Sequence, residues 1–229
     1  MPELKGRTFL VTGAGGNVGR AAVQRLLADG AKVAGLDHHE PHATGAFVGI
    51  GLDLTQEGAV AAAFATAEQQ LGPIWAVLHI AGGWQGGVTV ADTTVDAFET
   101  MLSRNLRTSF VVGREAMRRM VPRKEGRIVM VGSLTAATFT HLSGSGAYNV
   151  SKAGVIALTR VLAEEGAPHG VFANAIAPTT IATSANRDAM PKADESKWVP
   201  IEAVVDALLS VASPRSGVNG ATLTLTGRG

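Results

Sequence analysis

Two residues with complementary chemistry, Tyr148 and Lys152, stand four positions apart. Residues at this spacing share one face of a helix, so both side chains can reach the same bound molecule. A free tyrosine loses its proton only near pH ~10. A nearby ammonium favours the phenolate, and lowering that pKa by ~3 units corresponds to about 4 kcal/mol. The pair therefore predicts a tyrosine tuned to donate or accept a proton, although this spacing also occurs by chance in many helices.

The composition favours a single α/β domain. The chain has 229 residues, of which 46% are hydrophobic and 28 are glycine. Its net charge of +1 and lack of a basic run argue against nucleic-acid binding, and the absence of cysteine excludes disulfide or thiolate chemistry. No apolar run approaches the ~20 residues of a membrane span, and no His or carboxylate cluster has metal-ligand spacing. We expect a cytoplasmic protein with no membrane partner and no metal.

Short β-type runs alternate with helical ones, which predicts a doubly wound parallel sheet of about seven strands with helices on both faces. The domain is expected to span 1–229, with a loop or lid at about 178–200. Strands are expected at 8–12, 31–37, 46–52, 74–80, 127–132, 171–177 and 222–225. Helices are expected at 18–28, 57–71, 95–120, 147–165 and 201–211.

The turn after the first expected strand is rich in small residues, which would let a pyrophosphate approach backbone N–H groups. It contains Gly13, Gly15, Gly16, Asn17, Val18 and Gly19. A tight turn without function is the alternative. Asp37 ends the second strand, where a carboxylate can bind both ribose hydroxyls of NAD and repel a 2′-phosphate; an exposed turn aspartate is the alternative. NAD is therefore favoured over NADP.

Several further motifs follow in a fixed order. They are Asp53-Leu54, Ala81-Gly82, Asn105-Leu106, a strand that ends in Ser133, Tyr148-x-x-x-Lys152, Asn174 to Pro178, and Thr183. With the Thr12-Gly13 turn, this order resembles the short-chain dehydrogenase/reductase family over essentially the whole chain, which implies a Rossmann fold. Four positions depart from the family pattern: Asn17 replaces the middle glycine of the turn, His79 and Ile80 replace two asparagines, and Thr179 replaces a usual glycine after Pro178. Asn tolerates left-handed backbone, so we expect the turn to survive.

The resemblance implies hydride transfer between a nicotinamide and a small carbonyl or alcohol. Tyr148 would be the proton donor or acceptor, Ser133 would hydrogen-bond the reacting oxygen, Lys152 would lower the Tyr148 pKa, and Asn105 would hold a water of the proton relay. Cofactor contacts are implied for the turn residues above, Asp37, Asp53, Leu54, Ala81, Gly82, Tyr148, Lys152, Pro178, Ile181 and Thr183. Thr135 is a reserve candidate for the hydroxyl role, because the interval from Ser133 to Tyr148 is slightly long. Homotetramer or homodimer assembly through 95–120 and 147–165 is also implied.

Each candidate also has a structural interpretation. Ser133 could cap a helix, Asn105 could cap or kink one, and Lys152 could be a solvated charge. His79 is more typical of a hydrogen-bonded core histidine, and His141 of a surface loop.

The segments 80–87 and 186–194 resemble dihydropteridine reductase, a branch of the same family, and give Trp84, Asn186 and Met190 as tentative substrate residues. Trp84 could stack on a flat pterin, or Trp84 and Met190 could form only an apolar wall. That branch typically lacks the catalytic serine, whereas Ser133 is present. The alternatives to a carbonyl/alcohol oxidoreductase are therefore a dihydropteridine reductase-like enzyme and a non-catalytic NAD-binding redox sensor; a sensor usually loses the Tyr or the Lys, and both remain.

Overall fold

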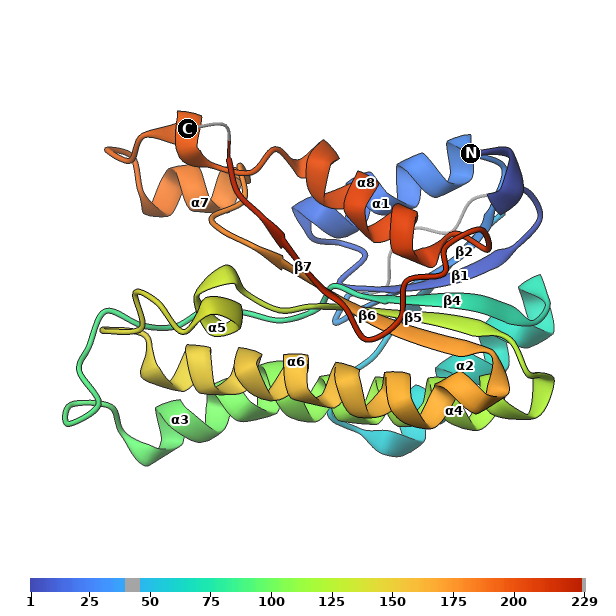
Figure 1. Cartoon of the computed structure of the whole chain (residues 1–229), viewed down its shortest axis with the longest axis horizontal. Coiled ribbons are helices and arrows are strands. Elements are labelled where there is room, and N and C mark those ends of the chain that lie inside the picture. The colour runs from blue at the N-terminus through green and yellow to red at the C-terminus, as the bar shows by residue number, and fades with distance from the viewer. Residues whose placement is uncertain (40–45, 228–229) are drawn as a thin grey trace.

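A parallel sheet forms the centre of the molecule (Figure 1). The computed structural model describes residues 1–39 and 46–227, and in this part of the chain seven strands pair in the order β3-β2-β1-β4-β5-β6-β7. The strands are β1 (Thr8–Thr12), β2 (Lys32–Asp37), β3 (Phe47–Gly51), β4 (Ile74–His79), β5 (Gly126–Val131), β6 (Val171–Pro178) and β7 (Thr222–Leu225). The expected doubly wound sheet is confirmed.

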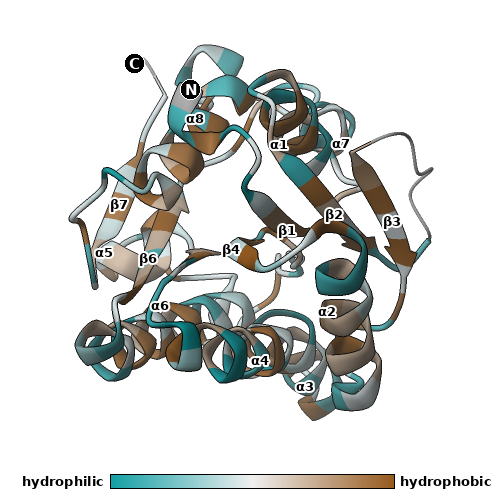
Figure 2. Cartoon of the chain, turned by 90° about the vertical axis from the view of Figure 1, so that its right-hand side faces the viewer, coloured by the Kyte–Doolittle hydropathy of each residue, from teal (hydrophilic) through white to brown (hydrophobic). Residues whose placement is uncertain are grey.

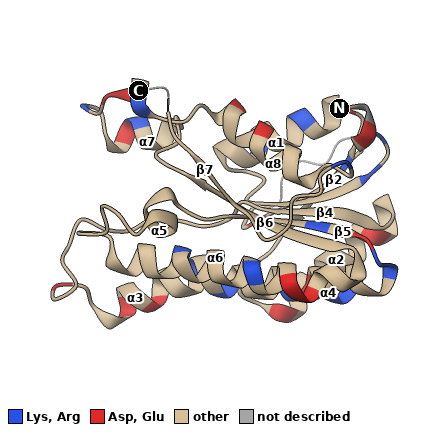
Figure 3. Cartoon of the chain, in the orientation of Figure 1, with Lys and Arg blue, Asp and Glu red and all other residues tan. Residues whose placement is uncertain are grey.

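Helices cover both faces of the sheet, because its strands are apolar on both sides. One face packs against α1 (Asn17–Ala28) and α8 (Ile201–Ala212), the other against α2 (Glu57–Leu71), α4 (Thr108–Arg123) and α6 (Gly146–Gly166). Figure 2 shows the apolar strands between these two layers. Charged side chains gather on the surrounding helices and turns (Figure 3). Among the described residues, no helix is long and apolar enough to cross a membrane.

Strand order places the two turns that matter for a ligand next to each other. The order reverses between β1 and β4, and ligands of open α/β sheets bind at such a switch point, beyond the carboxyl ends of the strands. Thr12 pairs with His79 at these ends, so the turns after β1 and β4 are neighbours. A Cβ on Gly13 would lie 2.9 Å from the backbone nitrogen of Ala81, and one on Gly19 would overlap the Gly13 carbonyl. Glycine at both positions allows this close approach.

Two regions differ from the sequence-based expectation. The helix expected over 95–120 consists of α3 (Val95–Met101), a π-helical turn η2 (Leu102–Arg107) and α4. The lid at about 178–200 contains α7 (Ser184–Ala189) and the 3-10 turn η4 (Glu195–Lys197), and a short helix α5 (Leu134–Thr138) follows β5. Hydrophobic periodicity and residue propensities do not predict such short elements, since each is only one or two helical turns long. The remaining short elements are the 3-10 turns η1 (Pro2–Leu4) and η3 (Ala167–His169).

Candidate active site

A cavity of about 940 Å³ opens at the carboxyl ends of the strands. Its walls contain most of the residues expected to bind a nucleotide: Gly13, Gly15, Gly16, Asn17, Val18, Gly19, Asp37, Asp53, Leu54, Ala81, Gly82 and Thr183. Segments from five different parts of the sequence therefore meet in one cleft. Ile80, which replaces a family asparagine, lines it too, as do residues that the sequence did not single out, among them Leu52, Ser103, Arg104 and Thr108. Among these residues, only Arg104 could have been predicted from the sequence, because it precedes Asn105.

Asp37 is fixed at the end of β2 by two backbone donors. Its Oδ2 accepts from the Gly15 nitrogen at 2.8 Å and its Oδ1 from the His38 nitrogen at 2.7 Å. A Cβ on Gly15 would lie 3.0 Å from Oδ2, so a side chain there would crowd the carboxylate. Further along the wall, the pKa of Asp53 is held below its usual range by hydrogen bonds from the backbone and side chain of Thr55. Both carboxylates are therefore held in place facing the cleft.

Asn17 does not need the left-handed backbone that we expected. It is the first residue of the right-handed helix α1, and it is not among the described non-glycine residues with positive φ, which are Lys124, Phe139 and His141. Its Oδ1 instead accepts a hydrogen bond from Ser184 Oγ at 3.3 Å. The substitution at the middle glycine position thus links the first turn to α7.

His79 is a satisfied core histidine. It is 1% exposed, its Nδ1 lies 2.8 Å from Thr12 Oγ1, and its Nε2 lies 3.5 Å from Thr108 Oγ1. Burial, with a smaller effect of the Lys152 charge, lowers its pKa to about 3. The imidazole is therefore neutral at physiological pH, and it joins β1 and β4 to the start of α4.

Asn105 sits in the π-helical turn η2 and ties it to two neighbouring segments. Its Nδ2 donates to the Gly83 carbonyl at 3.0 Å and to Ser151 Oγ at 2.9 Å, while its Oδ1 accepts from the Gly83 nitrogen at 2.9 Å. The side chain is buried. Both N–H groups are thus used within the protein, and one lone pair of Oδ1 stays available on the side of Gly82, whose Cβ would lie 2.8 Å from it.

Lys152 is buried on α6, with 6% of its surface exposed. Its Nζ donates to the Val131 carbonyl at 2.7 Å, at the end of β5. A Cβ on Gly82 would lie 3.2 Å from Nζ, so this glycine leaves the ammonium open toward the cleft. Burial lowers the Lys152 pKa from 10.5 to about 8. The cation is therefore held at a cost in solvation, which is typical of groups at functional sites.

Tyr148 is half-buried on the first turn of α6, one helical turn before Lys152. Burial raises the pKa of its phenol, and hydrogen bonding with Ser133 opposes part of that rise. Ser133, which is buried at the start of α5, lies 2.9 Å from Thr135 Oγ1. The predicted Ser133, Tyr148, Lys152 and Asn105 therefore converge at the carboxyl ends of β4 and β5.

The remaining predicted residues lie on the segment after β6. Pro178 ends β6, Ile181 forms a bridge with Val199, and Thr183 caps α7. Among these three, only Thr183 lines the large cleft. Asn186 is turned toward its own segment, since its Nδ2 donates to the Ile181 carbonyl at 2.8 Å.

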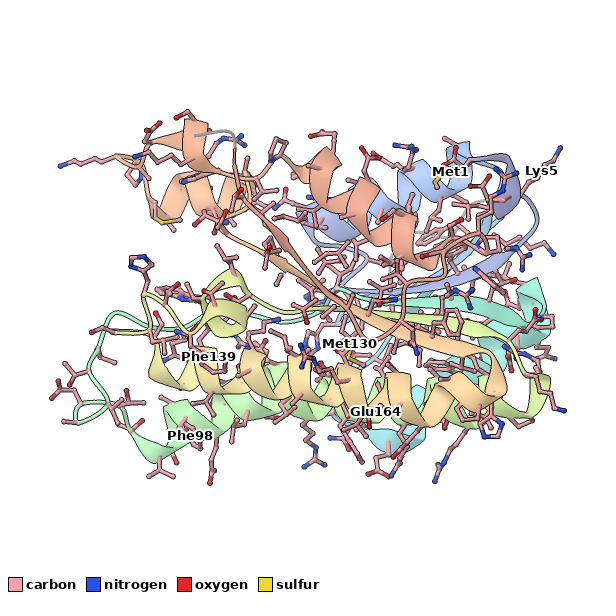
Figure 4. All side chains as sticks on the ribbon, viewed as in Figure 1. Met1, Lys5, Phe98, Met130, Phe139 and Glu164 are labelled. Atoms are coloured by element: carbon pink, nitrogen blue, oxygen red, sulfur yellow. The ribbon has the colours of Figure 1, made fainter. Side chains whose placement is uncertain are left out.

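Exposed apolar side chains lie on the segments that follow β4, α5 and α7. Trp84 is 60% exposed and Met190 38%. Phe139, which follows α5 (Figure 4), is 71% exposed and has a left-handed backbone with φ 55°. The loop that follows Trp84 is joined to the loop before α6 by a 2.7 Å bond from the Gly87 nitrogen to the Gly144 carbonyl. Exposed apolar side chains that gather in one patch mark binding regions.

Comparison with known proteins gives a consistent result. The family model described as short chain dehydrogenase matches residues 7–194. The 3-oxoacyl-[acyl-carrier-protein] reductase MabA of Mycobacterium bovis is 35% identical over 186 residues, which cover 81% of this chain and 74% of MabA. Galactitol 2-dehydrogenase of Rhizobium johnstonii is 32% identical over 207 residues, covering 82% of this chain and 79% of that enzyme. The crystal structure of gox2181 superposes with a TM-score of 0.89 at 30% identity, covering 97% of this chain and 95% of that one.

Proposed function

Because the chain belongs to the short-chain dehydrogenase family of oxidoreductases, we propose that it interconverts a small carbonyl compound and its alcohol with a nicotinamide cofactor, with Tyr148 as the proton donor or acceptor. The observation that carries the proposal is that Tyr148 lies near Ser133 and one helical turn before buried Lys152, whose ammonium lies next to Gly82 in the wall of the cleft. Fold alone would not support a reaction, whereas this set of side chains does.

The cleft has the features that a dinucleotide requires. Glycines at 13, 15, 16 and 19 leave backbone at its surface, and α1 begins there with its N-terminus. Asp37 would bind the adenosine ribose, with Asp53 and Leu54 beside the adenine and Thr183 at the nicotinamide end. We propose NAD rather than NADP, because the fixed Asp37 carboxylate would repel a 2′-phosphate and the neighbouring His38 carries no permanent positive charge. When bound, the cofactor would supply or accept the hydride.

The side chains at the end of β5 would handle the proton. In the reductive direction, Tyr148 gives its phenolic proton to the oxygen of the carbonyl as negative charge develops there. Ser133 lies beside this phenol and would position the same oxygen. Lys152, one helical turn away, would stabilise the phenolate that is left through its charge. In the structure the Tyr148 pKa is raised by burial and lowered only by Ser133, so the expected lowering by Lys152 is not found. Asn105 Oδ1 would accept a hydrogen bond from a relay water with its free lone pair, while the other hydrogen bonds of this side chain hold Gly83 in place.

The proposed substrate is small and mainly apolar near its carbonyl, because the segments that follow β4, α5 and α7 carry the exposed apolar side chains Trp84, Phe139 and Met190. MabA is named as a 3-oxoacyl reductase and the Rhizobium relative as a galactitol dehydrogenase, so both carbonyl and polyol substrates occur among similar proteins. Fewer residues support the pterin-reductase and redox-sensor alternatives, because Ser133, Tyr148 and Lys152 are all present.

A substrate panel tests the function directly. NADH and NADPH absorbance is followed with ketones, 3-oxoacyl thioesters, sugars and quinonoid dihydropterin, alongside Tyr148→Phe. We expect turnover with a carbonyl compound, lost by at least ~100-fold in the variant while NADH still binds. Turnover that survives in Tyr148→Phe would refute the assigned proton donor. Rapid reduction of the pterin alone would favour the dihydropteridine reductase alternative, and tight NADH binding without any turnover would favour the sensor.

We also propose that the protein is a cytoplasmic homotetramer or homodimer that assembles through α3, η2, α4 and α6. A shallow groove of about 600 Å³ lies on this layer, lined by Leu102, Leu106, Phe110 and Leu158 among others. Phe110 is 49% exposed and Val161 on α6 is 48% exposed. Figure 4 shows Phe98 on α3 at the outer side of the same layer. Glu99, Ser103 and Arg107 also line the groove, and a largely apolar groove on the outside of a helical layer supports contact with a second copy.

A further inference from the structure

Charged residues are unevenly distributed along the sheet edge at which ligands of such folds bind. Asp37 and Asp53 stand at the ends of β2 and β3 and line the large cleft. Asp, Glu, Lys and Arg are absent from the segments that follow β4, β5 and β6, and α5 and the first turn of α6 accordingly carry no charge colour in Figure 3. These segments are 80–91, 132–151 and 178–186. The part of the edge that carries Ser133 and Tyr148 is therefore uncharged.

The first two of these segments contact each other at the start of α6. The Gly87 nitrogen donates to the Gly144 carbonyl at 2.7 Å. A Cβ on Gly146 would lie 3.1 Å from Cγ2 of Val90, so the valine side chain packs against the first residue of α6. Tyr148 follows on the same turn of the helix. The loop after β4 is therefore held beside the turn that carries the phenol.

The apolar side chains of this loop are open to solvent. Trp84, Val88 and Val90 are exposed, Val90 to 80%, and form what we call the apolar rim. The Trp84 ring packs on Gly86, where a Cβ would lie 2.8 Å from Cζ2 of the ring and 2.7 Å from the Gly144 carbonyl. The rim thus lies against the loop before α6 and leaves apolar surface available to a ligand.

Charged groups on the neighbouring elements have other contacts. The Lys152 ammonium faces the nucleotide cleft, since a Cβ on Gly82 in the cleft wall would lie 3.2 Å from it. Arg104 lines the same cleft. Asp92, the first acid after the rim, accepts a hydrogen bond from the Thr89 hydroxyl. These contacts direct the two cations to the cleft and the carboxylate to its own loop.

The cations of the lid at 178–200 are mostly paired within it. Arg187 Nε lies 2.8 Å from Glu195 Oε2, and Lys197 Nζ lies 3.7 Å from Asp194 Oδ2. Lys192 is exposed to solvent, where water and salt screen its charge. An anionic substrate group would therefore lose its hydration at the rim without gaining a buried cation, whereas an uncharged apolar group gains from the burial of its surface.

We propose that the substrate is uncharged: a ketone or secondary alcohol whose apolar body lies on the apolar rim, without a carboxylate, a phosphate or a phosphate-bearing carrier. This inference rests on the proposed function and names its substrate class. Trp84 contacts the apolar body with its ring, and Val90 contacts it next to the start of α6. The phosphates of the complex are those of the cofactor, at the glycine turn after β1.

Matched pairs of carbonyl compounds that differ mainly in charge test the proposal. One pair is 9-oxodecanoate and its methyl ester. The other is acetoacetyl-coenzyme A and the acetoacetyl thioester of N-acetylcysteamine. With the preferred reduced cofactor, we expect kcat/KM to be at least ~100-fold higher for the uncharged member of each pair that is turned over. An equal or higher value for the anionic member overturns the proposal.

Binding can be followed without turnover, because Trp84 is exposed whereas Trp75 and Trp198 are buried. A ligand on the rim therefore changes the emission of Trp84. With NAD⁺ bound, which carries no hydride for a ketone, we expect the methyl ester of 9-oxodecanoate to bind at least ~10-fold more tightly than the acid. Equal binding of the two, or an unchanged emission, overturns the proposal. A failed substrate panel together with the expected binding would overturn the proposed reaction alone, so the two failures are distinguishable.

A cation placed on the rim should change this preference. Val90→Arg puts a guanidinium beside the start of α6, and we expect kcat/KM and affinity for 9-oxodecanoate, relative to its methyl ester, to rise about tenfold. Val88→Arg makes the same change if Val90→Arg does not fold. Val218→Arg is the matched control, since Val218 is exposed and precedes β7, at the opposite edge of the parallel sheet. An unchanged preference in both rim variants, or an equal change in Val218→Arg, contradicts binding at the rim.

Discussion

Replacing Lys152 with methionine tests the energetic cost of the buried ammonium. Burial lowers the Lys152 pKa from 10.5 to about 8, and a difference of one unit corresponds to ~1.4 kcal/mol. At pH 7 the folded protein therefore carries a penalty of about 3 kcal/mol for keeping this group charged. Methionine has a similar length and carries no charge, so Lys152→Met removes the penalty. It also leaves the Val131 carbonyl without its 2.7 Å donor, which costs about 2 kcal/mol.

The difference in the free energy of unfolding between Lys152→Met and the wild type should change sign with pH. Between pH 8 and pH 10.5 the unfolded chain binds more protons at this position than the folded one, so the free energy of unfolding of the wild type rises with pH. Between pH 7 and pH 10 the rise amounts to about 2 to 3 kcal/mol, and Lys152→Met lacks it. We expect the variant to be about 1 kcal/mol more stable than the wild type at pH 7 and about 1 to 2 kcal/mol less stable at pH 10.

Urea unfolding followed by circular dichroism at several values between pH 7 and pH 10 measures this difference. Groups remote from Lys152 titrate equally in both proteins and cancel, and His79, which lies near its charge, is already neutral in the folded protein across this pH range. Lys192→Met is the matched control, because Lys192 is exposed, and its difference from the wild type should not vary with pH. A Lys152→Met difference that stays constant from pH 7 to pH 10 would refute the reasoning. We expect Lys152→Met to lose turnover although it is more stable than the wild type at pH 7. Lys152 would then contribute to function at the expense of stability.

Two further predictions concern the cofactor and the assembly. Asp37→Ala removes the carboxylate fixed by Gly15, and we expect the ratio of kcat/KM for NADH over NADPH to fall about tenfold; an unaltered ratio would count against ribose binding by Asp37. Phe110→Glu puts a charge into the apolar groove, and sedimentation velocity should show smaller species than for the wild type. Phe139→Glu, on the segment after α5 and more exposed to solvent than Phe110 (71% against 49%), should leave the assembly unchanged; equal dissociation of both variants would disprove an interface at Phe110.

The sequence predicted the regular part of this fold well, because strands and long helices have a period that the residues repeat. The helix α2 begins and ends where expected, and so do β1 and β7. The π-helical turn around Asn105 has no such signal, since one inserted residue in a helical pattern leaves the apolar period almost unchanged. The turn is fixed instead by tertiary bonds from Asn105 to Gly83 and Ser151, which are 22 and 46 residues distant along the chain.

The sequence predicted the proximity of site residues that belong to one motif. It did not predict contacts between residues of two different motifs. Tyr148 and Lys152 share a helix, so their spacing was enough to bring them together. The contact of Asn17 with Ser184 crosses 167 residues, and the hydrogen bond from Thr135 to Asn149 joins α5 to α6. Neither follows from residue types along the chain.

The replacement of an asparagine by His79 shows how such a contact can preserve a site. Thr12 Oγ1 accepts from the Ala81 nitrogen at 3.2 Å, so its own proton is free to be donated to His79 Nδ1 at 2.8 Å. The imidazole must then carry its proton on Nε2, which faces Thr108 Oγ1. With its pKa lowered to about 3, the ring keeps this neutral form throughout the working pH range. A single uncharged side chain thus connects the first turn, the end of β4 and the helix that follows Asn105, and the departure from the family pattern leaves the cleft assembled.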